Sequence, residues 1–274
     1  MEYGKDYKHI PAVSVNSGSV EEAAPGVYCR TIQIVNVCLI QDQFATDNWV
    51  LVDAGMTGSA DSIIQFTESL LPDGLLPRAI LLTHGHFDHV GAIIELINHW
   101  NIPVYAHPFE IPYLTGKENY PEGSTLPKGL MAKLSPYYPN EAINLDKHVQ
   151  ELPLDGEVPF LKGWRWVHTP GHTKGHVSFI REEDRVLIAG DAFVTVKQES
   201  LYHVVVQDLE ISGPPQYFTF HWTEAKESVS KLEELKPSAA VTGHGKPVRG
   251  AKLAGGLKDL VTNFDKAAVP SRHH

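Results

Sequence analysis

The chain has 274 residues, of which 42% are hydrophobic and 20% are charged, a composition that predicts a folded globular protein. Its 23 lysines and arginines stand against 33 aspartates and glutamates, and the resulting formal charge of −10 disfavours nucleic acid and anionic membranes as partners. The first eleven residues lack the apolar segment of a secretory signal, and no apolar run of about eighteen residues occurs. We therefore expect a cytoplasmic protein.

The first half of the chain predicts a series of strands followed by a βαβ unit. Strands are expected at 27–34, 35–41, 48–52, 79–83 and 104–106. Helical periodicity is expected at 60–71 and from Val90 to Ile97. Ser59 is a candidate N-cap for the first of these helices. The continuous apolar run at 79–83 is typical of a strand covered on both faces.

Cys29 and Cys38 are the only cysteines. Both fall within one apolar, strand-like stretch at 27–40, and their separation of nine would place them on opposite faces of a regular strand. We therefore expect buried free thiols in a reducing compartment.

Residues 107–152 form an irregular excursion. It is rich in proline and tyrosine, with prolines at 108, 112, 121, 127, 136 and 139. Long excursions in a compact domain often cover a functional site. A lid, a dimer contact and a surface embellishment without a role all remain open.

The second half repeats the order of strand and helix. Strands are expected at 164–167, 177–180, 185–189 and 239–241, and a helix at 222–235. We expect residues 1–274 to form one domain that includes the excursion.

A histidine-rich cluster follows the buried strand at 79–83. His84 and His86 alternate, so that both imidazoles can face the same ion. Asp88 and His89 are out of phase with that pair and can face a second ion. Imidazole and carboxylate suit Zn²⁺, Mn²⁺ or Fe²⁺. The alternative, an exposed polar turn, does not explain three histidines and one aspartate within six residues.

Three more candidate ligands stand where loops follow predicted strands, which is where α/β proteins place ligands. They are His172, Asp191 and His244. A lone histidine flanked by glycine is more often a turn residue, but here each candidate ends an apolar strand, as the first cluster does. Together they supply the donors that a site for two ions needs.

Four strings resemble the metal motifs of the metallo-β-lactamase superfamily: residues 83–89 (Thr-His-Gly-His-Phe-Asp-His), 169–176, 189–191 and 242–245. The similarity covers about residues 25–250. It implies an α+β fold, a four-layer αββα sandwich with metal ions at one sheet edge. It also implies that His84, His86 and His172 hold one ion, that Asp88, His89 and His244 hold the other, and that Asp191 bridges them. Asp53 would support the ligands without binding an ion itself.

The resemblance implies a hydrolase with two divalent ions, Zn²⁺ being expected and Fe or Mn being alternatives. The ions would activate a hydroxide for attack on a carboxylic ester, lactone or thioester, and Asp88 would also carry a proton to the leaving group. Tyr202 is a candidate for polarising the substrate carbonyl, as a tyrosine does in some lactonases of the superfamily. His203 is a further candidate for lining the pocket.

Several alternatives remain open at this stage. They are a hydroxyacyl-thioester hydrolase of the glyoxalase II type, an amide hydrolase of the β-lactamase type, and a metal-binding scaffold without activity. Asp191 argues against the true β-lactamases, which generally lack the bridging aspartate. We expect a small-molecule substrate; the oligomeric state is not predicted, and a homodimer is compatible with the sequence.

Overall fold

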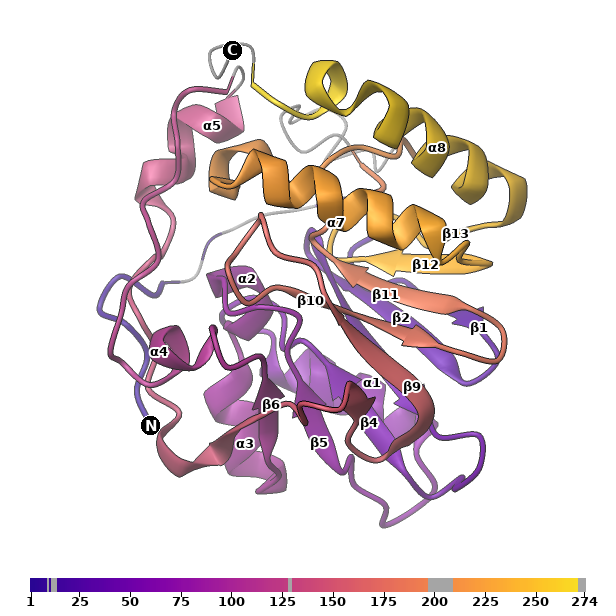
Figure 1. Ribbon diagram of the computed structural model, residues 1–274. Helices are drawn as coiled ribbons and strands as arrows, with labels where there is room; N and C mark the ends of the chain where they lie inside the picture. The colour runs from indigo at the N-terminus through magenta and orange to yellow at the C-terminus, as the bar shows by residue number, and fades with distance from the viewer. Residues whose placement is uncertain (9, 11–13, 128–129, 197–208, 271–274) are drawn as a thin grey trace.

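Two β-sheets lie face to face with helices on both outer faces, which confirms the expected four-layer αββα sandwich (Figure 1). The computed structural model describes residues 1–8, 10, 14–127, 130–196 and 209–270. Among these residues, no helix is long and apolar enough to cross a bilayer.

The first sheet has seven strands in the order of the chain. They are β1 (Val20–Ala24), β2 (Val27–Ile32), β3 (Val35–Gln41), β4 (Trp49–Val52), β5 (Ala79–Leu81), β6 (Val104–Ala106) and β7 (Val149–Glu151). β1 to β4 pair antiparallel, whereas β4 to β7 pair parallel. Helices α2 (Phe87–Val90) and α3 (Ile93–Trp100) connect β5 to β6, so the predicted βαβ unit is confirmed.

The second sheet has six strands in the order β13-β12-β11-β10-β9-β8. Their bounds are β8 (Glu157–Val158), β9 (Leu161–His168), β10 (Val177–Arg181), β11 (Val186–Gly190), β12 (Ala239–Thr242) and β13 (Val248–Arg249). Only β11 and β12 pair parallel. β9, β11 and β12 therefore end at the same edge of this sheet.

The strands are apolar at successive positions because both faces of each sheet are covered. In β4, Val50 and Val52 pack into the core between the two sheets, whereas Trp49 and Leu51 pack under the helices. This period of two follows from the pleat of a strand, and a strand buried on both faces reads as a continuous apolar run.

The two helical layers come from different parts of the chain. Helices α1 (Ala60–Leu70) and α3 cover the first sheet, and α7 (Trp222–Glu234) and α8 (Gly250–Ala267) cover the second (Figure 1). Ser59 is the N-cap residue of α1, as predicted, but its hydroxyl donates to the Met56 carbonyl and does not cap the helix.

The excursion at 107–152 has short helices and one strand. They are α4 (Ile111–Leu114), α5 (Leu130–Leu134), the 3₁₀ turns η1 (Ser135–Tyr137) and η2 (Asp146–His148), and finally β7. Prolines at 121, 127, 136 and 139 interrupt the middle part of the excursion, because a proline inside a helix removes a backbone donor.

Cys29 and Cys38 are buried and free, as expected. The expected placement on opposite faces of one strand is wrong, because a turn at Gln33 separates β2 from β3. The two cysteines are directly opposite each other in that antiparallel pair.

The packing of α8 predicts a large loss of stability on truncation of Phe264, which is 1% exposed. Phe264→Ala should lower the free energy of unfolding by about 3–5 kcal/mol, since it removes apolar contacts and leaves a cavity. Urea denaturation measures this change. Lys258→Ala on the exposed face of the same helix should cost less than about 0.5 kcal/mol, and equal losses in both variants would contradict this packing.

Candidate metal centre

The predicted ligands meet where several strands end. His84 and His86 follow β5, and Asp88 and His89 lie on α2 directly after them. His172 lies in the loop after β9, while Asp191 and His244 follow β11 and β12. All seven side chains are buried, with exposures between 0% and 8%.

The first group consists of His84, His86 and His172. Nδ1 of His86 lies 3.1 Å from Nε2 of His84 and 2.9 Å from Nε2 of His172. Nitrogen ligands at about 2.0–2.1 Å from a tetrahedral Zn²⁺ lie roughly 3.3 Å apart. The three nitrogens are therefore close to the separation that one ion requires.

The second group consists of Asp88, His89 and His244. Nε2 of His244 lies 3.3 Å from Oδ2 of Asp88. Asp191 stands between the two groups: its Oδ2 is 3.4 Å from Nε2 of His244 and 3.5 Å from Nε2 of His172. A carboxylate in this position can face two ions at once.

Hydrogen bonds behind four of the histidines determine which ring nitrogen faces the cluster. Nδ1 of His89 donates to Asp53, and Nδ1 of His244 donates to the carbonyl of Ile34. The remaining two partners are hydroxyls, Thr83 behind His84 and Thr219 behind His172. The Thr83 hydroxyl donates its own proton to Asp53, and the Thr219 hydroxyl donates to the Pro215 carbonyl. Each hydroxyl oxygen therefore accepts a hydrogen bond from the imidazole. Nε2 is thus the nitrogen of all four rings that faces the cluster and can bind an ion once it carries no proton.

Two buried atoms within the cluster are better suited to binding a metal ion than to bonding with any protein group that the structure describes. Nε2 of His89 and Oδ1 of Asp191 have no hydrogen-bond partner among the described residues, although they lie only 3.7 Å apart. A buried polar atom without a partner is costly, and a cation would satisfy both atoms. The donor set therefore fits divalent ions.

The charges of the two groups differ before any ion binds. Burial lowers the pKa of all three histidines in the first group, to about 4 for His86, so these imidazoles are neutral. Burial also acts to lower the pKa of His89 and His244. The carboxylates of Asp53 and Asp191 outweigh it for His89 and hold its pKa well above the usual range, whereas Asp191 and Asp88 raise the pKa of His244 to about 10. Ion binding at the second group must therefore release protons.

Two supporting residues hold the loops in place. His176 is fully buried, and its Nε2 accepts the backbone N–H of Asp191, so it orients that carboxylate. Nδ2 of Asn36 donates to the carbonyls of Thr242 and Gly245, on both sides of His244. A buried amide at the start of the apolar strand β3 is a sequence signal that could have identified Asn36.

A small cavity of about 40 Å³ borders the first group. His86 and His172 line it, together with aromatic Tyr113, Tyr120 and Phe220 and the exposed Lys174. Tyr202 and His203 lie outside the described residues.

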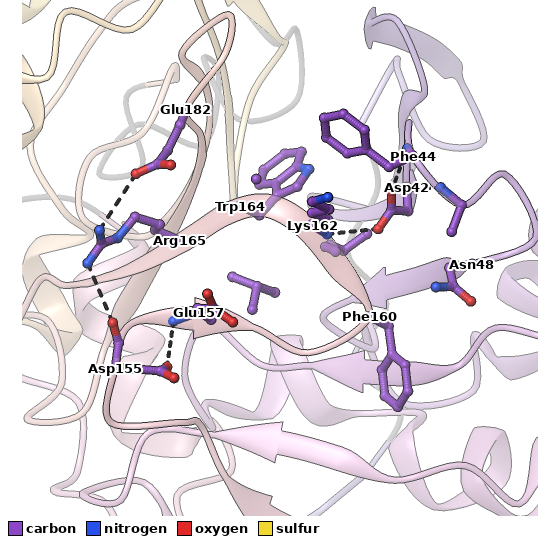
Figure 2. Close-up of a pocket in the computed structure, with 14 residues that line it drawn as sticks. Asp42, Phe44, Asn48, Asp155, Glu157, Phe160, Lys162, Trp164, Arg165 and Glu182 are labelled. Atoms are coloured by element: carbon purple, nitrogen blue, oxygen red, sulfur yellow. Dashed lines mark hydrogen bonds and ion pairs between the residues drawn. The ribbon is translucent and has the colours of Figure 1, made fainter.

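A larger cavity of about 600 Å³ lies between the β8–β9 hairpin and the turn after β3, and none of the seven predicted ligands lines it (Figure 2). Its size alone does not make it the site of chemistry, since the clustered donors lie elsewhere.

Residues 30–244 match the family model described as the metallo-beta-lactamase superfamily. The chain belongs to this superfamily. It is 49% identical over 257 residues to the probable metallo-hydrolase YflN of Bacillus subtilis, which covers 93% of this chain and 97% of that protein. It is 32% identical over 158 residues to the hydroxyacylglutathione hydrolase GloC of Haemophilus influenzae, covering 57% of this chain and 65% of that protein.

Among solved structures, TTHA1623 in a di-iron-bound form is 28% identical, with a TM-score of 0.51, and covers 78% of this chain and 89% of that one. The family resemblance expected from the four motifs is thus confirmed.

We expect the metal affinity of this superfamily member to be sensitive to substitution of Gly243. A Cβ there would lie 2.0 Å from Oδ1 of Asp191 and 2.8 Å from His89, so Gly243→Ala must displace the carboxylate. We expect the affinity for added Zn²⁺ to fall at least about tenfold, as measured by chelator competition. Gly255→Ala, where no atom lies within 4 Å, is the matched control. Unchanged affinity in Gly243→Ala would contradict the geometry.

Proposed function

We propose that the protein is a metal-dependent hydrolase that binds two divalent ions and cleaves a carboxylic ester, lactone or thioester. The observation that carries the proposal is the pair of unpartnered buried atoms, Nε2 of His89 and Oδ1 of Asp191, within a cluster of ligand-type side chains. The name of the relative YflN, a probable metallo-hydrolase, supports the reaction class.

In this proposal the first group holds one ion, the second group holds the other, and Asp191 bridges them. The position of Oδ2 of Asp191, within 3.5 Å of ring nitrogens in both groups, supports the bridging role. The di-iron form of TTHA1623 supports a count of two. Zn²⁺ is the proposed metal and Fe or Mn are alternatives, because imidazole and carboxylate suit all three.

Two bound divalent ions would lower the pKa of water towards about 7 and would polarise a substrate carbonyl. In this proposal Asp88 moves the proton; its Oδ2 lies 3.3 Å from Nε2 of His244 within the cluster. It can accept a proton from the attacking water and deliver it to the departing oxygen or sulfur.

The cavity beside the first group is the proposed seat of the acyl part of the substrate. Tyr113, Tyr120 and Phe220 give it an aromatic wall, and Lys174 adds a positive charge at its exposed side. At about 40 Å³ the cavity is much smaller than an ordinary ligand pocket of about 300–1,000 Å³, so only the end of the acyl part would enter it. This arrangement favours a small-molecule substrate.

A hydroxyacyl thioester is the second candidate substrate. The similarity to GloC, named as a hydroxyacylglutathione hydrolase, favours it. Its departing thiolate would need little proton assistance, whereas the alkoxide of an ester or lactone depends on Asp88.

A panel of four substrates tests the reaction class: an acyl thioester, a homoserine lactone, an aryl ester and a β-lactam. We expect metal-loaded protein to hydrolyse at least one of the first three faster than the β-lactam. Dialysis against a chelator should abolish turnover, and added Zn²⁺ should restore it. Protein that holds two ions and hydrolyses none of the four would refute the proposal.

Asp88→Asn tests the proton transfer, since an amide cannot accept the proton. At saturating metal we expect kcat for an ester to fall about 10²- to 10⁴-fold, with a smaller effect on a thioester that has a good leaving group. Metal content must be measured on the same sample, because Asp88 is also a proposed ligand. A fully loaded variant with wild-type kcat would remove Asp88 from the mechanism.

A further inference from the structure

Glu110 is a fully buried carboxylate in the excursion, and it joins the two loops that carry the first group. Its Oε1 accepts the hydroxyl of Thr173 at 2.6 Å and the backbone N–H of Gly175 at 3.0 Å. Its Oε2 accepts the backbone N–H of Gly85 at 2.9 Å and the hydroxyl of Tyr120. One side chain thus connects segments that are far apart in the sequence.

All four partners act as donors, which is the arrangement that an ionised carboxylate requires. Such a carboxylate has about four acceptor positions and no donor, and here all four are used. Burial raises the pKa of the Glu110 carboxyl, and the four donors oppose that shift. Hydrogen bonds to a charged acceptor are stronger than those to a neutral one, so the link is stiff.

The two glycines leave the space that the carboxylate fills. A Cβ at Gly85 would lie 2.6 Å from the hydroxyl of Tyr120. A Cβ at Gly175 would lie 2.7 Å from Cγ of Glu110 and 2.8 Å from its Oε1. Both loops therefore approach Glu110 with their backbone and not with a side chain.

The bonded atoms are adjacent to the histidines in the chain. Gly85 separates His84 from His86, and Thr173 follows His172 directly. The loop after β5 and the loop after β9 belong to different sheets, so their separation is not fixed by strand pairing. Glu110 fixes it.

We propose that Glu110 is a positioning residue that holds the two loops at the separation needed for one ion to bind the first group. This inference rests on the proposed two-ion function. Tyr120 extends the effect to the substrate side, since its ring lies 4.6 Å from that of His86 and lines the small cavity.

Glu110→Gln tests the proposal with almost no change in shape. Whichever way the amide is turned, its NH₂ group meets a backbone N–H, that of Gly85 or of Gly175, and neither donor can rotate away. One loop is therefore released. We expect one of two Co²⁺ equivalents to bind about 10- to 100-fold more weakly in a chelator competition titration, with a changed visible spectrum of the bound Co²⁺.

Asp42→Asn is the matched control. Asp42 is also a buried carboxylate, 2% exposed, and it accepts the backbone N–H groups of Phe44, Ala45 and Lys162 beside the larger cavity (Figure 2). It lies away from both loops. This variant should lose stability in a thermal melt but bind both Co²⁺ equivalents with wild-type affinity.

Thr173→Val provides a second measurement if Glu110→Gln fails to fold. It removes one donor from the His172 loop and keeps the carboxylate, so we expect a loss of about two- to fivefold in the same equivalent. Wild-type affinity in both variants, or an equal loss in Asp42→Asn, would overturn the positioning role. Wild-type protein that binds no Co²⁺ would overturn the two-ion function as well. Two ions without hydrolysis would refute only the function.

Discussion

Three buried carboxylates, Asp53, Asp88 and Asp191, lie beside six buried histidines at one edge of the sandwich, the five predicted ligands and His176. An ionised group taken out of water costs several kcal/mol unless a partner of opposite charge or a set of hydrogen bonds compensates it. Protons on His89 and His244 compensate part of the buried negative charge in the metal-free protein, and metal cations would compensate all of it. The hydroxyl and carbonyl acceptors behind the histidines, the bare Cα of Gly243 and the strand ends keep these groups together despite that cost.

The metal-binding cluster was predictable because its chemistry is local in the sequence. Four candidate ligands fall within His84 to His89, and the alternation of His84 and His86 is visible without any knowledge of the fold. The αββα layers could be predicted only through the family resemblance, whereas strands such as β4 and β5 could be predicted from their apolar runs. Leu253, Leu257, Leu260 and Phe264 had the helical spacing that would have predicted α8, yet sequence reasoning overlooked it.

Glu110 could not be predicted, for a physical reason. Its partners lie 10 to 65 residues away, and two of the four bonds use backbone N–H groups, which leave no trace in residue type. Thr219, 47 residues from His172, is hidden in the same way. The cysteines show the opposite error: a spacing rule that holds within one strand failed because a two-residue turn lay between them. Sequence patterns report on one element at a time, and a buried polar network depends on several.

The two hydrogen bonds of Asn36 span 206 and 209 residues, and they tie the third strand to the loop that follows β12. During synthesis at about 5–20 residues per second, roughly eight to thirty seconds separate the emergence of His89 from that of His244. Over that interval the donors that follow strands of the second sheet are made in turn, first His172, then Asp191 and finally His244 after β12. The donor set is therefore complete only once β12 and the loop after it have been made, and a chain that stops short of β12 lacks His244.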